Sequence, residues 1–190
     1  ALALAQNDLV LSLDADEALD ERLQQSILSA KKNKMAAGYT MNRCTYYCGR
    51  FIRHGAWYPD RKLRLFSRQL AQWGGTNPHD KVEFHSPQTS IHLAGDILHY
   101  SYYTLEEHIT QNNKFSTIAA ESYFSRGKRT SLFRIWFNPC WAFFSGFFLR
   151  GGFLDGFYGY VIARNVAHLT FMKHSKLYLL QRKATNGKNE

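Results

Sequence analysis

The stretch "LVLSLDADE", residues 9–17, decides how this sequence is interpreted. A short apolar run, Leu9 to Leu13, ends in three acids within four residues: Asp14, Asp16 and Glu17. The apolar run is typical of a buried strand that ends at the first acid. Side chains two positions apart on a strand point the same way, so Asp14 and Asp16 can face one point beyond its end.

Two explanations of these acids stay open. Carboxylates placed close together repel unless a cation or proton lies between them, and a divalent metal ion takes oxygen ligands of this kind. In open α/β sheets, ligands also collect at the carboxyl ends of strands. Alternatively, Asp16 caps a helix expected over 17–34, where the acids complement the helix dipole. Both can hold, because Asp14 can bind metal while Glu17 begins the helix.

The composition is that of a globular protein with a surplus of basic residues. Twenty-four Lys and Arg against fifteen Asp and Glu give a net charge of +9, which favours partners that carry phosphate. The three cysteines, Cys44, Cys48 and Cys140, are too few for a disulfide framework and indicate a reducing compartment. Cys44, Cys48 and the nearby His54 lack a fourth zinc ligand, so packed thiols are the favoured interpretation.

The chain divides into a strand-rich part and a helical part. Short strands are expected over 37–66 and 96–102, and a loop broken by glycine and proline lies between them. Thr104 and Glu107 form a capping box that predicts the start of a helix. Further helices are expected over 131–149, interrupted at Pro139, and over 157–182. The predicted organisation is a catalytic part, 1–103, a helical and membrane-associating part, 104–182, and a disordered tail, 183–190.

Five segments in a fixed order point to a known family: "LDADE", "GRFIRHGAWYPDRKLRLFSR", "GGTNPHDKVEF", "LHYSYYTLEEHI" and "GGFLDGFYGYVIA". Together they resemble the family 2 glycosyltransferases of the GT-A fold, and most of all the β-1,4-glucosyltransferase-like proteins of the bacterial lipopolysaccharide core. The resemblance covers about residues 1–180 and implies an α/β, Rossmann-like fold. Family members begin with a βαβ half that binds the nucleotide, and this sequence is expected to lack that half.

The resemblance implies that a sugar moves from a nucleotide-diphosphate donor to an acceptor hydroxyl, with inversion. Mn²⁺ or Mg²⁺ held by Asp14 and Asp16 would offset the charge of the leaving diphosphate. His99 of "LHYSY" is the expected third metal ligand, although a lone histidine among apolar residues is also typical of a packed core.

The acceptor hydroxyl must lose a proton, which requires a base. Asp80 of "PHDKVEF" falls where the family usually has the Glu of a His-Glu pair, so Asp80 is the expected catalytic base. Its shorter side chain departs from the common pattern. His79 beside it is expected to orient a sugar, while "NPHD" is equally a good turn sequence.

Basic and aromatic residues near these motifs are candidates for substrate binding. Arg61, Lys62 and Arg64 can bind the donor diphosphate or a phosphorylated lipid acceptor. Trp57 and Trp73 offer flat faces for stacking on sugar rings. The alternative is a set of solvated basic edges with ordinary core aromatics.

The last third of the chain is rich in aromatic residues. The eighteen residues from Leu132 to Leu149 approach the length of a membrane span, but Arg134, Asn138 and Pro139 interrupt them. A helix in the membrane interface is favoured, with arginines at the lipid phosphates. The alternative is a hairpin packed on the catalytic part or on a dimer partner. Asp155 in "GFLDG" is interpreted as a helix-start signal.

The sequence thus predicts a metal-dependent inverting glycosyltransferase that uses a nucleotide-diphosphate sugar and a cell-envelope glycan or lipid-linked saccharide. It would be cytoplasmic and peripheral on the inner face of the cell membrane, and the fragment alone need not be active. One alternative is a catalytically inactive membrane-associated partner. A basic nucleic-acid-binding module is the other, and no nucleic acid is expected because the positive charge is scattered along the chain and the aromatics form long apolar runs.

Overall fold

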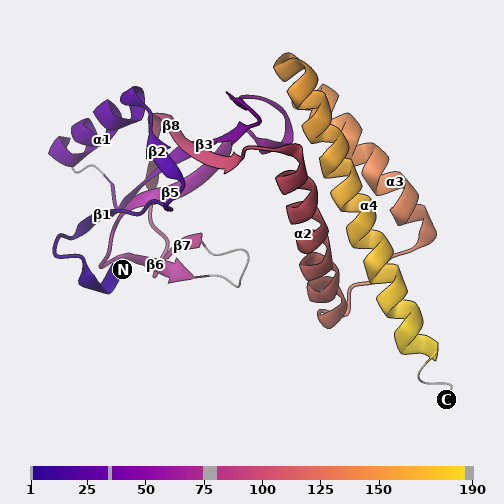
Figure 1. Ribbon diagram of the computed structural model, residues 1–190. Helices are drawn as coiled ribbons and strands as arrows, with labels where there is room; N and C mark the ends of the chain where they lie inside the picture. Colours follow the sequence, from indigo (N-terminus) through magenta and orange to yellow (C-terminus); the bar gives the residue numbers. More distant parts are fainter. Residues whose placement is uncertain (1, 34–35, 75–80, 187–190) are drawn as a thin grey trace. The chain divides into compact units, whose positions relative to one another are not determined.

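The computed structural model describes residues 2–33, 36–74 and 81–186 (Figure 1). The chain forms two compact units, which we call the sheet unit and the helical unit. The sheet unit comprises Ala1–Tyr46 and Tyr58–Ser101, and the helical unit comprises Tyr47–Trp57 and Tyr102–Glu190. The predicted α/β class with C-terminal helices is confirmed. The inclusion of residues 47–57 in the helical unit had no signal in the sequence.

The sheet unit is built on a sheet with the strand order β1-β5-β3-β8-β2. Its strands are β1 (Leu9–Leu11), β2 (Glu17–Leu19), β3 (Gly38–Tyr47), β5 (Asp60–Ser67) and β8 (Ser90–Tyr102). The pairs β1–β5, β3–β5 and β2–β8 are antiparallel. The acids follow the carboxyl end of β1, as the sequence predicted, and β1 lies at one edge of the strand order.

The segment after the acids forms a strand before it forms a helix. Glu17–Leu19 pairs with β8, and the helix predicted over 17–34 is α1, Glu21–Asn33. Its cap is Asp20, whose Oδ1 accepts a hydrogen bond of 2.7 Å from the backbone N–H of Leu23. The predicted cap at Asp16 is wrong, because pairing with β8 extends the chain through Leu19 and delays the helix.

Gly95 allows α1 to begin against β8. Its φ of +111° lies in the left-handed region, and a Cβ there would stand 2.3 Å from the nitrogen of Leu23. The neighbouring Asp96 N–H donates to Asp20 Oδ2 at 3.0 Å, so one carboxylate caps the helix and fixes it to the sheet.

Two apolar clusters hold the sheet unit together. α1 contributes Leu23 to a buried cluster with Met41, Leu65 and Ile97. The two-stranded sheet of β6 (Ala71–Gly74) and β7 (Lys81–Phe84) packs Ala71 and Val82 against Phe66. A 3₁₀ turn, η1, covers Leu2–Leu4.

The helical unit contains two long helices and a third that is more exposed. In chain order its elements are β4 (Arg50–Phe51), η2 (Gly55–Trp57), α2 (Leu105–Ser125), α3 (Leu132–Phe144), the π turn η3 (Ser145–Leu149), the 3₁₀ turn η4 (Gly152–Asp155) and α4 (Gly156–Asn186). The Thr104–Glu107 capping box is confirmed at the start of α2. α3 continues through Pro139 rather than stopping there, and α4 extends to Asn186, four residues into the predicted tail.

Polar contacts fix α4 to its neighbours. Lys176 Nζ donates to Ser116 Oγ and Thr117 Oγ1 of α2, both at 2.7 Å. His174 lies between Thr130 and Asn138, with ring nitrogens 2.9 and 3.0 Å from their side chains. Of the helices in the part of the chain that the structure describes, none is long and apolar enough to cross a membrane.

Candidate active site

The acidic residues lie on a short link between the two outer strands of the sheet. β1 and β2 stand at opposite ends of the strand order, and only residues 12–16 join them. The Ser12 N–H donates to the Arg64 carbonyl at 2.8 Å, and the Tyr100 N–H donates to the Asp16 carbonyl at 2.9 Å. Between these points the Glu17 N–H closes a turn onto the Asp14 carbonyl at 3.0 Å. The link is therefore fixed at both ends.

The buried side chain of Glu17 stabilises this turn. Its side chain has no exposed area, and its Oε2 accepts the Asp14 N–H at 3.0 Å. Its Oε1 lies 3.1 Å from Arg64 Nη2 and 3.7 Å from Arg43 Nη1. A buried carboxylate is costly unless cations and donors surround it, and these contacts supply both. The sequence suggested Glu17 only as a helix start, so this role was missed.

Arg64 reaches the turn because β5 carries a bulge at that residue. Tyr39 pairs with Leu65 and Thr40 with Leu63, which leaves Arg64 as the extra residue of β5. Bulges re-aim side chains, and here the guanidinium meets Asp14 Oδ2 at 2.6 Å. Its carbon lies 5.3 Å from the centre of the Trp73 ring. Among the described residues, the buried Nε and Nη1 of Arg64 find no hydrogen-bond acceptor.

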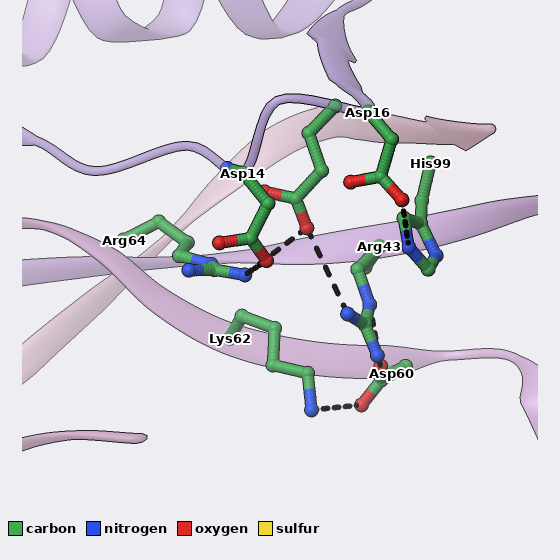
Figure 2. A network of polar contacts seen from close by, with 8 residues as sticks. Asp14, Asp16, Arg43, Asp60, Lys62, Arg64 and His99 are labelled. Atoms are coloured by element: carbon green, nitrogen blue, oxygen red, sulfur yellow. Dashed lines mark hydrogen bonds and ion pairs between the residues drawn. The ribbon is translucent and has the colours of Figure 1, made fainter. Parts of the chain in front are cut away.

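Asp16 is paired separately, with His99. Figure 2 shows Asp14 turned toward Arg64 and Asp16 toward His99, whose Nε2 lies 3.2 Å from Asp16 Oδ2. Burial is the largest cause that lowers the pKa of His99, and Arg43 lowers it further against the opposing effect of Asp16 and Glu17. The imidazole is therefore neutral near pH 7, and Nε2 carries the proton that faces the carboxylate.

A second pair of contacts extends the network along β3 and β5. Arg43 and Asp60 are direct strand partners, with Nη2 and Oδ2 2.8 Å apart, and Lys62 Nζ lies 3.0 Å from Asp60 Oδ1 (Figure 2). Arg43 and Asp60 were not candidates from the sequence, because only the strand register brings them together. Arg61 lies between Asp60 and Lys62, so it points to the opposite face of the strand and is exposed.

The structure thus gathers five of the predicted site residues within the sheet unit. Asp14, Asp16, Arg64, Trp73 and His99 belong to one connected set of contacts. Arg61 lies on the other face of β5. Trp57 belongs to the helical unit, where its ring stacks on Tyr102 with centroids 5.5 Å apart.

The two candidates for base and sugar contacts, His79 and Asp80, lie outside the described residues. A shallow hollow of about 250 Å³ in the sheet unit, lined by Ser29, Tyr39 and His92 among others, contains none of the predicted site residues.

Asp14 and Asp16 are better placed than His99 to bind a hard divalent cation. Asp14 and Asp16 are each half exposed, and each uses Oδ2 for its protein contact. A metal-bound histidine usually donates its second ring N–H to an acceptor. The buried Nδ1 of His99 has no such partner in the described parts of the chain. No group of three His, Cys, Asp or Glu side chains within those parts is arranged to hold a metal ion.

Comparison with known proteins identifies relatives across nearly the whole chain, although no family model matches it. An "Uncharacterized glycosyltransferase" of Rickettsia felis is 30% identical over 195 residues, covering 93% of this chain and 66% of that protein. A counterpart in Rickettsia typhi is 29% identical, covering 98% and 67%. The "Lipopolysaccharide core biosynthesis glycosyltransferase LpsC" of Rhizobium meliloti is 27% identical over 172 residues, covering 88% and 62%. The chain spans about two thirds of the length of the curated relatives it matches.

Proposed function

We propose that this chain, a homologue of glycosyltransferases, carries the metal- and phosphate-binding part of an enzyme that transfers a sugar from a nucleotide-diphosphate donor with inversion. The observation that carries the proposal is the turn of residues 14–17, which presents two half-exposed carboxylates, one paired with Arg64 and the other with His99. The acceptor we propose is a cell-envelope glycan or lipid-linked saccharide. One relative, LpsC, is named for lipopolysaccharide core biosynthesis, which supports that acceptor class.

Asp14 and Asp16 are the proposed ligands of Mn²⁺ or Mg²⁺. When bound, the ion acts as a Lewis acid that offsets the charge of the departing diphosphate. The protein's own contribution is to fix the two carboxylates: Glu17 holds the Asp14 backbone, and His99 orients Asp16. We propose that His99 acts mainly through this hydrogen bond, because its other nitrogen lacks the partner a ligand histidine would have.

Arg64 is the proposed phosphate-binding residue. Its guanidinium already stacks on Trp73 and pairs with Asp14 and Glu17. A cation at Asp14 would weaken the Asp14–Arg64 pair and release one N–H of Arg64 Nη2, while Glu17 still accepts from the same nitrogen. A planar guanidinium suits the oxygens of a diphosphate. Donor binding and cation binding are therefore expected to reinforce one another.

Asp80 is the proposed base, with His79 beside it to orient a sugar. The support is the family resemblance together with the position of Asp80 in the chain. Asp80 directly precedes Lys81, and Lys81 is the strand partner of Gly74, the residue after Trp73.

The enzyme is proposed to work at the cytoplasmic face of the inner membrane, where a lipid-linked acceptor would be met. The basic helical unit with its exposed aromatic residues supports that location.

The test is a Mn²⁺ titration of Asp16→Asn beside Asp60→Asn, a matched change within the same network. Loss of a direct ligand should weaken Mn²⁺ binding at least about 100-fold, since even outer contacts of metal sites contribute 10- to 100-fold. Asp60→Asn should leave the affinity nearly unchanged. Equal Mn²⁺ affinities of the native protein, Asp16→Asn and Asp60→Asn would contradict the metal role of Asp16.

Turnover is measured on the 190-residue chain and on any longer product of its reading frame, with Mn²⁺ and a panel of nucleotide sugars. Transfer by the native protein and its collapse in Asp80→Asn, with donor affinity retained, is the expected result. Neither transfer nor donor hydrolysis in any form would favour the inactive, membrane-associated alternative.

A further inference from the structure

The net positive charge of the protein lies in the helical unit. That unit carries fourteen Lys and Arg against five Asp and Glu, whereas the sheet unit carries ten of each. The net charge of +9 is therefore the net charge of the helical unit alone, although basic residues occur in both units. Residues 122–154 contain no acidic side chain, yet they include Arg126, Lys128, Arg129, Arg134 and Arg150.

The helix α3 exposes its most apolar side. It contains no buried residue, and Phe133 and Trp136 are 66% and 71% exposed. The less exposed side chains of α3 include Asn138, which bonds to His174 of α4, and Phe143, whose ring lies 6.0 Å from that of Tyr160 in α4. An amphipathic helix of a protein in water presents the reverse arrangement.

Ring contacts join exposed aromatic residues of α3 and η3 into two groups. Phe133 stacks on Phe137, with centroids 5.4 Å apart. Further contacts run from Trp141 to Phe144 at 6.1 Å and from Phe144 to Phe148 at 5.3 Å. We call this the aromatic surface and define it by its exposed residues in α3, η3, η4 and the start of α4: Phe133, Trp136, Trp141, Phe148, Phe153 and Phe157.

A basic loop is fixed beside this surface by Asp155. The carboxylate is 2% exposed, and its Oδ2 accepts the N–H groups of Arg53 and His54 at 3.1 and 2.8 Å. Its Oδ1 lies 3.2 Å from His54 Nδ1 and 3.7 Å from Arg50 Nη2. Asp155 is thus the last residue of η4 and an anchor for the loop, rather than the simple helix-start signal expected from the sequence.

The same loop is joined to the turn that carries Arg150. The Gly55 N–H donates to the Arg150 carbonyl at 2.9 Å. A Cβ on Gly55 would lie 3.3 Å from the Cα of Gly152, so the two turns are in close contact. Arg50, Arg53 and Arg150 therefore border the turns that expose Phe148 and Phe153.

We infer that the helical unit docks on an anionic phospholipid bilayer through the aromatic surface, with Arg50, Arg134 and Arg150 meeting lipid phosphates. Aromatic side chains favour the headgroup boundary, and basic residues beside them are attracted by anionic lipid. This deepens the proposed function, because it names the surface and lipid class through which the enzyme would meet a lipid-linked acceptor.

Charge and composition favour a bilayer over other occupants. A second copy would bring the same basic border against itself, with no acidic residue in 122–154 to complement it. Nucleic-acid surfaces interleave basic and aromatic residues on one face. Here the aromatic residues of α3 and η3 instead contact one another.

The test is vesicle flotation of the 190-residue chain, with phosphatidylcholine alone or with equal parts phosphatidylcholine and phosphatidylglycerol. Binding is expected only to the anionic vesicles, and it should weaken as the salt concentration rises. Trp136→Ser with Phe153→Ser should reduce it about 100-fold or more, because two exposed aromatics lose their burial in lipid. Arg134→Gln with Arg150→Gln should reduce it about 30-fold.

Matched controls lie in the sheet unit. Leu28→Ser removes an apolar side chain that is 52% exposed, and Lys31→Gln with Lys32→Gln removes two exposed charges of α1. Both should bind vesicles as the native chain does, and circular dichroism should show all variants folded. Asp16→Asn should also bind normally, so failure of the proposed chemistry would not be mistaken for failure of the docking surface.

Several results would overturn the inference. Unchanged binding by the aromatic double variant would do so, as would equal binding to neutral vesicles at all salt concentrations. A dimer that the aromatic variant abolishes, without vesicle binding, would assign the surface to a second copy. Salt-sensitive binding to an oligonucleotide with no binding to vesicles would assign it to nucleic acid.

Discussion

In the sheet unit ten acidic residues balance ten basic ones, and many of them meet in a single network around Asp14, Glu17 and Arg64. In the helical unit fourteen basic residues face five acidic ones, and the buried acid, Asp155, anchors a basic loop. The sheet unit uses charge at short range, to position carboxylates. The helical unit retains a surplus of positive charge, which in the proposed docking would attract anionic lipid at longer range.

The two units also differ in where they place apolar side chains. In the sheet unit, Leu23, Met41 and Ile97 have no exposed area. In the helical unit, α3 presents large aromatic residues to its surroundings. The comparison teaches that candidate chemistry and candidate attachment are separated along the chain, and each can be altered without the other.

The largest effect on stability is expected from Glu17→Gln. The substitution keeps the shape but removes the buried charge that lies between Arg43 and Arg64. Loss of one partner from a buried ion pair costs about 3 kcal/mol of unfolding free energy or more. Urea denaturation measures it, with Asp60→Asn as the control. Asp60 is partly exposed, so its loss should cost about 1 kcal/mol or less. Equal costs for the two variants would show that Glu17 is not the centre of the network.

The next effect is a pH dependence that arises in the helical unit. His108 is buried against Tyr47, and burial lowers the pKa of His108 to about 4. The folded state therefore holds a neutral imidazole, while the unfolded state takes up a proton below about pH 6.5. Stability should be full above pH 6.5 and decline by about 3 kcal/mol between pH 6.5 and 4.

His108→Gln is the variant that isolates this dependence. It should remove most of the decline in the unfolding free energy between pH 6.5 and 4, whatever its effect at pH 7. An unchanged slope would show that other groups cause the acid sensitivity.

A smaller loss is expected from Asp155→Asn. The amide keeps one acceptor oxygen but loses the charge that holds Arg50 and His54 and strengthens the bonds from the loop. Hydrogen bonds to a charged group contribute about 2 kcal/mol, and a loss of that order in unfolding free energy is expected. Glu121→Gln, on the exposed surface of α2, should stay within about 0.5 kcal/mol. Equal losses of unfolding free energy in Asp155→Asn and Glu121→Gln would contradict the anchoring role of Asp155.

The smallest effect is expected from Arg61→Gln. Arg61 is exposed on the face of β5 opposite the network, so stability should change by less than about 0.5 kcal/mol. Turnover should stay within about twofold of the native rate, whereas Arg64→Gln should lose it. A large loss of turnover in Arg61→Gln would place substrate contacts on the other face of the strand.

Local signals in the sequence predicted the elements that depend on neighbours in the chain. The Thr104–Glu107 box predicted the start of α2, and the Asp-x-Asp stretch was singled out as the candidate site. The enzyme class inferred from the motifs agrees with the names of the relatives. These features need only residues a few positions apart.

Features that depend on distant pairing could not be predicted. Strand β2 exists because Glu17 meets His99, more than eighty residues away, and this pairing overrode the helix expected from local pattern. The bulge that turns Arg64 toward Asp14 follows from the register of β3 and β5. Asp155 meets Arg53 and His54 across about a hundred residues, which no spacing in the sequence reveals.

The most direct measurement of the central claim is the anomalous scattering of Mn²⁺ in crystals soaked with the ion and a nucleotide-diphosphate sugar. A single peak in contact with a carboxylate oxygen of both Asp14 and Asp16, with the diphosphate on its far side and close to Arg64, is the result expected. A donor bound without a metal peak at these carboxylates, or an ion held elsewhere on the chain, would contradict the account.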